Sequence, residues 1–275
     1  MDKLLFGTAG IPISTNPRST AEGIKQVKNI NLGCMELEFV HSINISMDKA
    51  PIIKEAAKKN DVVLTCHAPY FINLNSEEPE KVHASIYRIM RSAETLYACG
   101  GWSVCFHPGF YMKSTKEQAY APVKENIKKI SKELIDKGVD VWIRPETTGK
   151  GTQFGDYIEL LKISQEVENV MPVFDFSHIH ARTNGKYNTE VEFRKILEDI
   201  ESYLGKEGLD NMHIHLSGIN YGEKGEKNHL ILEESDMNYK SLVKIWKEFK
   251  IKGCVICESP NIEEDALLLK KTYEG

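Results

Sequence analysis

Residues 62–109 read VVLTCHAPYFINLNSEEPEKVHASIYRIMRSAETLYACGGWSVCFHPG and contain the unit that decides the fold. An apolar run at 62–69 ends in polar and small residues, an amphipathic stretch follows at 81–98, and a second apolar run occupies 102–109. The two runs have the composition of buried strands, and the stretch between them has helical periodicity. This order predicts two parallel strands joined by a helix.

The same unit recurs along the chain of 275 residues. Helical patterns separate the apolar runs, with Ser19 or Thr20 as an expected N-cap and Gly138 as an expected C-cap. Eight such units predict a (β/α)₈ TIM barrel, and no change of composition divides the chain, so we expect a single domain over residues 1–275. A doubly wound sheet would carry a GxGxxG turn, which GTAGIP at 7–12 does not match. The expected strands are 4–10, 34–40, 62–69, 102–109, 140–149, 170–178, 212–218 and 253–260.

Composition limits the classes of protein that remain. Hydrophobic residues make up 41% and charged residues 27% of the chain, which is typical of a globular protein and excludes a disordered one. The net charge of −5 argues against a protein that works mainly by coating nucleic acid, because such proteins are usually basic, so a nucleic-acid partner would need a local basic rim. We find no signal peptide and no membrane span. Six scattered cysteines suggest reduced core residues of a cytoplasmic protein, and Cys254 and Cys257 should face opposite sides of a strand.

Histidines and carboxylates gather at the ends of the predicted strands. In a barrel these ends meet at one face, where active sites are built. Converging imidazoles and carboxylates are the ligands that a site with several metal ions requires. A single histidine at a strand end is more often a hydrogen-bonded loop residue than a metal ligand. That interpretation does not explain why histidines and carboxylates occur together at the ends of six strands. The candidate ligands are His67, His107, Glu146, Asp175, His178, His215 and Glu258.

Several motifs extend this pattern over nearly the whole chain. They are CHAPYFINL (66–74), FHPG (106–109), RPETTGKGTQFG (144–155), DFSH (175–178), HIHLSG (213–218), NHL (228–230) and CESPN (257–261). In these motifs the sequence resembles the endonuclease IV family of apurinic/apyrimidinic endonucleases, within the wider group of xylose-isomerase-like barrels. His41, His83 and His213 stay outside the expected ligand set, His213 as a buried neighbour of His215.

The resemblance implies a site for two or three zinc ions. His67, His107 and Glu146 match the ligands of the first zinc. The residues that match the second are Glu146 as a bridge, Asp175, His215 and Glu258.

His178 and His229 match two ligands of the third zinc. The family has an aspartate two residues before the matching histidine, where this chain has Lys227. The third zinc is then absent, weakly held, or completed by Glu223 or Glu226.

The activity that the resemblance implies is base excision repair of DNA. A metal-activated hydroxide would cleave the phosphodiester on the 5′ side of an abasic site, with Glu146 and Glu258 as the catalytic carboxylates. Tyr70 and Phe71 match side chains that the family inserts into the DNA helix at the gap left by the missing base. Packing of the loop against the barrel would explain these two residues equally well. Arg182 and Lys227, with Lys150, Lys186 and Lys224, are expected at DNA phosphates. The loop VHSINISMDKA lacks the arginine that bacterial members insert into DNA. We expect a monomer that acts on DNA containing abasic sites.

Two other classes stay open. A sugar isomerase or epimerase of the same barrel group holds one divalent metal, and the ligands would be Glu146, Asp175, His215 and Glu258. Under that reading His67, His107 and His229 contact substrate or have no role. A metal-binding module without activity is the third reading. The number of metal ions per chain distinguishes the nuclease, with two or three zinc ions, from the isomerase or epimerase, with one divalent ion.

Overall fold

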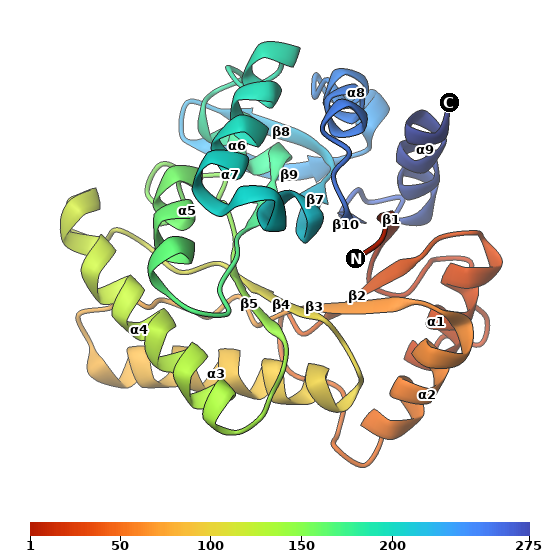
Figure 1. Ribbon diagram of the computed structural model, residues 1–275, viewed down its shortest axis with the longest axis horizontal. Helices are drawn as coiled ribbons and strands as arrows, with labels where there is room; N and C mark the ends of the chain where they lie inside the picture. Colours follow the sequence, from red (N-terminus) through yellow and green to blue (C-terminus); the bar gives the residue numbers. More distant parts are fainter.

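All eight expected strands are present and form a parallel barrel (Figure 1). The computed structural model describes residues 1–275. The strands are β1 (Leu4–Ala9), β2 (Cys34–Glu38), β3 (Val63–His67), β4 (Ser103–Phe106), β5 (Trp142–Pro145), β6 (Val173–Asp175), β7 (Met212–Leu216) and β10 (Gly253–Cys257). They neighbour one another in the order β5-β4-β3-β2-β1-β10-β7-β6. Bridges between Ile143 and Val170 and between Glu146 and Val173 join the two edges, which confirms the TIM barrel.

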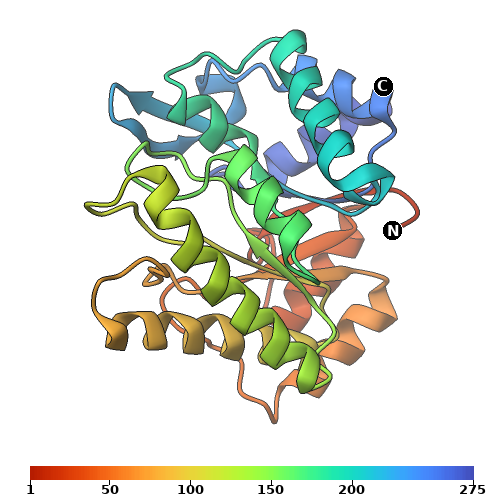
Figure 2. The same cartoon turned by 60° about the vertical axis from the view of Figure 1, so that its left-hand side comes forward.

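Nine helices surround the strands, with α3 and α4 side by side on the outside (Figures 1 and 2). They are α1 (Thr20–Asn29), α2 (Ala50–Asn60), α3 (Pro79–Ala98), α4 (Lys116–Asp136), α5 (Tyr157–Glu166), α6 (Phe176–Arg182), α7 (Glu190–Asp210), α8 (Tyr239–Phe249) and α9 (Glu263–Glu274). Ser19 caps α1, as expected, by accepting a hydrogen bond from the Glu22 amide. Gly138 follows the end of α4 with φ of 69°, a conformation that favours glycine.

The main core lies between the strands and the helices, whereas the interior of the barrel is polar. A cluster of 63 buried residues, including Leu64 and Val104, forms this core. Inside the barrel, Glu36 and Arg144 are buried, with the Arg144 guanidinium over the Trp102 ring. The polar groups of the interior lie directly beneath the strand ends that carry the expected ligands.

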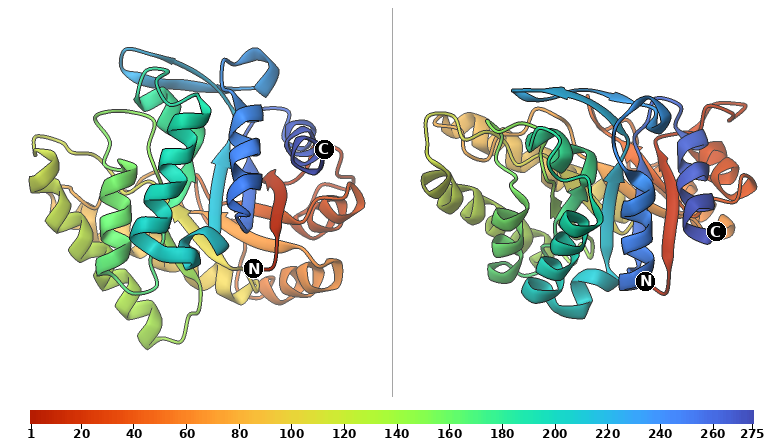
Figure 3. Two further views of the ribbon diagram at one scale, coloured as in Figure 1. Left: turned by 45° about the horizontal axis from the view of Figure 1, so that its top comes forward. Right: turned by 90° about the horizontal axis from the view of Figure 1, so that it is seen from above.

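A hairpin that the sequence pattern did not reveal follows β7. Its strands, β8 (Gly218–Gly222) and β9 (Gly225–Leu230), are antiparallel, and a short 3₁₀ turn at Leu232–Glu234 follows them. The hairpin lies across the end of the barrel toward which the strands run (Figure 3). It therefore covers part of the face where the expected ligands gather.

All six cysteines are free and buried, as expected. Cys254 packs with Cys34 in a small separate cluster, whereas Cys257 belongs to the main core, so the two cysteines face different surroundings. None of the helices combines the length and the apolar character that a membrane span requires.

Candidate metal centre

Glu146 lies at the middle of a histidine cluster at the carboxyl end of the barrel. It follows β5 directly, and its side chain is fully buried. Its Oε2 lies 3.3 Å from His67 Nε2 and 3.4 Å from His107 Nε2. Its Oε1 lies 3.3 Å from His178 Nδ1 and 3.2 Å from His215 Nδ1. Each oxygen of one carboxylate thus faces its own pair of histidine nitrogens.

Strand order and alternation explain this convergence. β3, β4 and β5 are neighbours, with His67 opposite Cys105 and Phe106 opposite Pro145. Across the barrel, Asp175 in β6 pairs with His215 in β7. Alternate residues of a strand point to the same side, so the residues at these strand ends face the barrel axis together.

A second group of ligand atoms surrounds Glu146 Oε1. Atoms of Glu146, Asp175, His215 and Glu258 lie within 4.8 Å of one another, as the resemblance implies for the second zinc. His215 Nδ1 is 3.4 Å from Glu258 Oε1. Burial raises the pKa of Glu258 well above its ordinary range despite the opposing charge of His215, and the Asp175 carboxylate adds to the rise. The geometry places all four expected residues in one group.

A third group contains His178, Glu226 and His229, and it excludes Lys227. Glu226 Oε2 lies 3.6 Å from His178 Nε2. In the hairpin, Asn220 pairs with Asn228 but Tyr221 pairs with Glu226, so Lys227 is the extra residue of a β-bulge. The bulge turns Glu226 to the side of His229, which a regular strand would not do for residues three apart. Among the alternatives left open, the geometry favours completion by Glu226.

The donor set fits divalent cations. Asp175 Oδ2 and Glu258 Oε2 are buried and have no aligned hydrogen-bond partner. Unpaired buried oxygens of this kind are costly, and a cation would pair with them. Histidine nitrogen and carboxylate oxygen are common protein ligands of zinc. The residues present therefore suit one or more divalent metal ions.

Charges in the cluster shift the pKa of several groups. Burial opposes ionisation of Glu146, but the neighbouring histidines, His215 first, lower the pKa of Glu146 well below its ordinary range. Burial also disfavours a charged His67, yet Glu146 raises the pKa of His67 to about 9. The pKa of His178 rises for the same reason, against burial and through Asp175 and Glu146. A divalent cation in this cluster would compete with protons for the same histidine nitrogens.

Exposed aromatic side chains border the cluster. Tyr70 is 53% and Phe71 is 64% exposed, and both follow β3. The Tyr70 ring lies 5.3 Å from the His67 ring. Phe110, after β4, is 41% exposed and was not among the expected residues. Exposed rings beside a metal-binding cluster can stack on parts of a nucleic acid.

The residues expected at DNA phosphates differ in whether their charged groups already make hydrogen bonds within the protein. Arg182 donates from one nitrogen to the carbonyls of Lys150 and Gln153 and from another to the Tyr111 hydroxyl. These bonds hold the loop after β5, so the guanidinium is largely engaged within the protein. Lys227, in contrast, is exposed on β9.

Sequence reasoning missed Glu36, Glu38 and Cys105. Cys105 Sγ donates to Glu146 Oε2 over 2.9 Å. Glu36 and Glu38 stand on β2, where carboxylates in the otherwise apolar run CMELEFV were the available signal. Cys105 precedes His107 by two residues, so strand alternation could have placed its thiol in the site.

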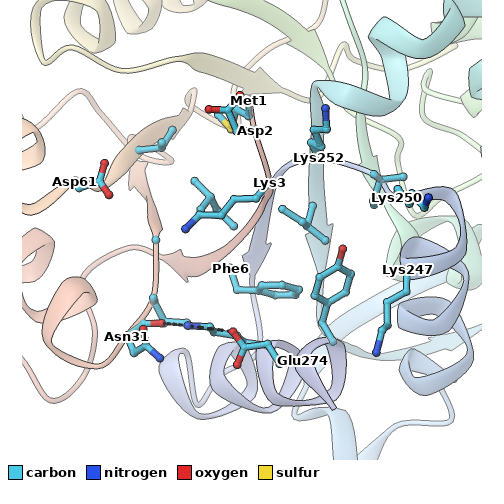
Figure 4. Close-up of a pocket in the computed structure, with 18 of the residues that line it drawn as sticks. Met1, Asp2, Lys3, Phe6, Asn31, Asp61, Lys247, Lys250, Lys252 and Glu274 are labelled. Carbon is cyan, nitrogen blue, oxygen red and sulfur yellow. Dashed lines mark hydrogen bonds and ion pairs between the residues drawn. The ribbon is translucent and has the colours of Figure 1, made fainter.

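A cavity of about 1070 Å³ opens elsewhere, at the end of the barrel where the strands begin (Figure 4). Lys3, Lys247, Lys250 and Lys252 line it from two separate segments of the chain. Some of the lining lysines pair with carboxylates, as Lys28 does with Asp61 and Lys252 with Asp210. The cavity lacks the convergent histidines of the opposite face, where barrel active sites lie.

Comparisons with known proteins agree with the sequence resemblance. A family model described as xylose isomerase-like TIM barrel matches residues 24–272. An uncharacterized protein of Methanocaldococcus jannaschii is 48% identical over 98% of this chain and 97% of its own length. A probable endonuclease 4 of Mycoplasma pneumoniae is 26% identical, over 79% of this chain and 75% of its own length.

Solved structures with the same fold include proteins named as nucleases and proteins named as sugar epimerases. Endonuclease IV from Thermus thermophilus has a TM-score of 0.73 at 18% identity, covering 98% of this chain and 97% of that one. A D-tagatose 3-epimerase-like protein has a TM-score of 0.72 at 19% identity, covering 98% of this chain and 96% of that one. Overall shape therefore does not separate a nuclease from a sugar epimerase.

Proposed function

Because this chain belongs to the xylose isomerase-like TIM barrel family, we propose that it is a zinc-dependent endonuclease. Its substrate would be DNA with abasic sites, and it would hydrolyse the phosphodiester on the 5′ side of the lesion. The probable endonuclease 4 relatives support the nuclease branch of the family. The geometry of Glu146 supports the chemistry.

The arrangement of Glu146 is the observation that carries the proposal. Its Oε2 faces His67 and His107, and its Oε1 faces His178 and His215. A carboxylate that serves two histidine pairs suits a bridge between two metal ions. A mononuclear site needs only one of these pairs.

The charge of the centre also suits several cations. Four carboxylates contribute atoms to the ligand groups described above, and two more, Glu36 and Glu38, are close enough to raise the pKa of His67. When metal ions hold these carboxylates ionised, one divalent ion would offset only two of their negative charges. The six carboxylates are Glu36, Glu38, Glu146, Asp175, Glu226 and Glu258.

The groups of residues imply distinct roles. His67 and His107 with Glu146 would hold one metal ion, and Asp175, His215 and Glu258 with Glu146 a second. When bound, such ions activate water at neutral pH and neutralise phosphate charge. Glu146 and Glu258 are the carboxylates that we assign to catalysis. His178, Glu226 and His229 would hold a third ion.

DNA would approach across the exposed rings at the mouth. An abasic nucleotide has no base to unstack, so rotating it into the site costs little. Tyr70 and Phe71 would enter the space that the missing base leaves. Lys227 and Lys186, both exposed near the hairpin, would contact phosphates. We leave Arg182 out of this set because its donors hold the loop after β5.

A sugar epimerase is the second candidate. The group formed by Glu146, Asp175, His215 and Glu258 is sufficient for one divalent ion. The fold similarity to a D-tagatose 3-epimerase-like protein is as high as that to endonuclease IV. This candidate leaves the convergence of His67 and His107 on Glu146 without a function.

The test is nicking of a duplex oligonucleotide with one abasic site. Zinc-loaded protein should cleave on the 5′ side of the site and leave a 3′-hydroxyl, and cleavage should weaken steeply with added salt. Glu146→Gln should abolish nicking. Glu166→Gln, which removes a surface carboxylate paired with Lys124, serves as the matched control and should nick normally. Absence of nicking by the wild type, or nicking by Glu146→Gln at the wild-type rate, would contradict the proposal.

A further inference from the structure

Glu36 lies inside the barrel, beneath the metal centre. It is fully buried on β2, and its Oε1 is 2.9 Å from His215 Nε2. Its Oε2 accepts a hydrogen bond of 2.7 Å from Thr65 Oγ1 and lies 3.3 Å from His213 Nε2. His213 Nδ1 is in turn 2.9 Å from Ser103 Oγ. Groups from two other strands, β3 and β7, therefore surround this carboxylate, and Ser103 of β4 contacts one of them.

The two nitrogens of His215 face different partners. Nδ1 faces Glu146 and Glu258, and Nε2 faces Glu36. A neutral imidazole carries one N–H and one lone pair, so Nδ1 can bind a cation only when the proton is on Nε2. His215 Nε2 and Glu36 Oε1 are both buried and lie 2.9 Å apart, and neither has an aligned hydrogen-bond partner. Glu36 is thus the acceptor available to that proton.

We propose that Glu36 is the positioning residue of His215, holding its proton on Nε2 and its Nδ1 lone pair toward the metal centre. Carboxylates behind metal-bound histidines fix the ring and the tautomer, and their loss typically weakens metal binding 10- to 100-fold. The inference rests on the metal centre of the proposed function. It adds a residue to that centre which touches neither substrate nor metal.

An alternative is that Glu36 binds a cation itself. Atoms of Glu36, His213 and His215 lie within 4.8 Å of one another. The Arg144 guanidinium is buried in the same interior and acts electrostatically on His213. A cation at this point would meet the buried charge of Arg144 with only one carboxylate to offset it, which is unfavourable in a low-dielectric interior. A positioning role needs no such charge.

The experiment compares zinc-loaded wild type with Glu36→Gln in the absence of DNA. Competition with a chelator should show zinc held 10- to 100-fold more weakly in the variant, with the same number of ions at saturation. ¹⁵N NMR of the histidine rings in the metal-free proteins, at a pH at which His215 is neutral, should show His215 protonated at Nε2 in the wild type and a mixture of tautomers in the variant. Glu263→Gln removes another buried carboxylate, which accepts from the Ile13 and Ser14 amides, and should keep wild-type zinc affinity.

Unchanged zinc affinity and an unchanged His215 tautomer in Glu36→Gln would overturn the inference. Loss of one whole ion would also overturn it, because Glu36 would then be a ligand. If Glu36→Gln does not fold, Thr65→Val releases Glu36 Oε2 without removing a charge, and zinc should bind several-fold more weakly; unchanged affinity there contradicts the inference. Because this experiment contains no DNA, its result does not depend on whether the protein nicks DNA in the assay described above.

Discussion

Lys227, which the sequence resemblance places where the endonuclease IV family has an aspartate, stands on a β-bulge and faces solvent. Its neighbour Glu226 turns toward His178 instead, at 3.6 Å. One inserted residue in a strand therefore exchanges which side chain enters the site. The carboxylate is therefore kept but comes from the neighbouring position, Glu226 in place of residue 227. The spacing of the motifs alone could not reveal this shift.

Removal of the Glu226 charge should weaken the third metal group alone. We expect Glu226→Gln to lower the affinity for the last zinc ion to bind, because a neutral amide is a poorer ligand than a carboxylate. Zinc titration of metal-free protein measures this. Glu223→Gln, on the exposed part of the same hairpin, is the control and should titrate as the wild type does. Equal effects of the two variants would show that Glu226 has no special place in the site.

The metal-free protein should lose stability as the pH rises from about 6.5 to about 9. The pKa of His67 is raised from 6.5 to about 9 by Glu146, so its contribution is complete below the unfolded value and disappears as the pH passes the folded one. The raised pKa of Glu38, to about 7 through burial and Glu36, acts in the same direction. Urea unfolding in EDTA at the two pH values measures the change. A stability that is constant or rising with pH would contradict these shifts.

Residues with an obvious metal chemistry could be predicted from the sequence, and their supports could not. His67, His107 and Glu146 stand at the ends of recognisable strands, and the barrel brings such ends together. Glu36 escaped prediction because its partner His215 lies on a strand that is remote in sequence, across the interior. Nothing in the run CMELEFV states which histidine a buried carboxylate will meet.

The hairpin β8–β9 carries two of the three residues of the third group, Glu226 and His229. Tyr221 donates a 2.6 Å hydrogen bond to Asp236, which also lies 3.0 Å from His180 Nε2 in α6. These contacts tie the hairpin to the barrel near the bulge. The Tyr221 hydroxyl is therefore one of the connections that position Glu226 and His229, together with the bond from the Glu226 amide to the Gly149 carbonyl.

Tyr221→Phe should weaken the third metal group without altering the others. Loss of the hydrogen bond costs about 1 kcal/mol, which corresponds to roughly a fivefold loss of affinity for the last zinc ion. The zinc titration described above measures it. Tyr97→Phe, which alters an exposed tyrosine of α3, should change nothing. If Tyr221→Phe leaves all zinc affinities intact, the hairpin holds its position by other means.

The secondary-structure elements differed in how well they could be predicted from the sequence. The eight barrel strands are short apolar runs between amphipathic helices, and each appeared within the expected range. The hairpin did not, because residues 218–230 are polar and rich in glycine and lack an apolar alternation. Its strands are stabilised by contact with α6 and the loop after β5, which the local pattern does not contain.

At the scale of the whole molecule, we expect the fold to form without the metal centre. The main core of 63 buried residues lies between strands and helices, away from the carboxyl end where the histidines gather. The barrel therefore presents its ligands from a framework that is complete without metal. What the shape alone cannot decide is the reaction, since nuclease and epimerase structures match it equally well.

The number of metal ions per chain tests the central claim, that Glu146 bridges two metal ions, most directly. Elemental analysis of the zinc-loaded protein should give two or three ions per chain, and His67→Ala should remove one of them while the others remain. A single ion per chain that is unaffected by His67→Ala would contradict the bridge and place the metal in the group of Glu146, Asp175, His215 and Glu258 alone.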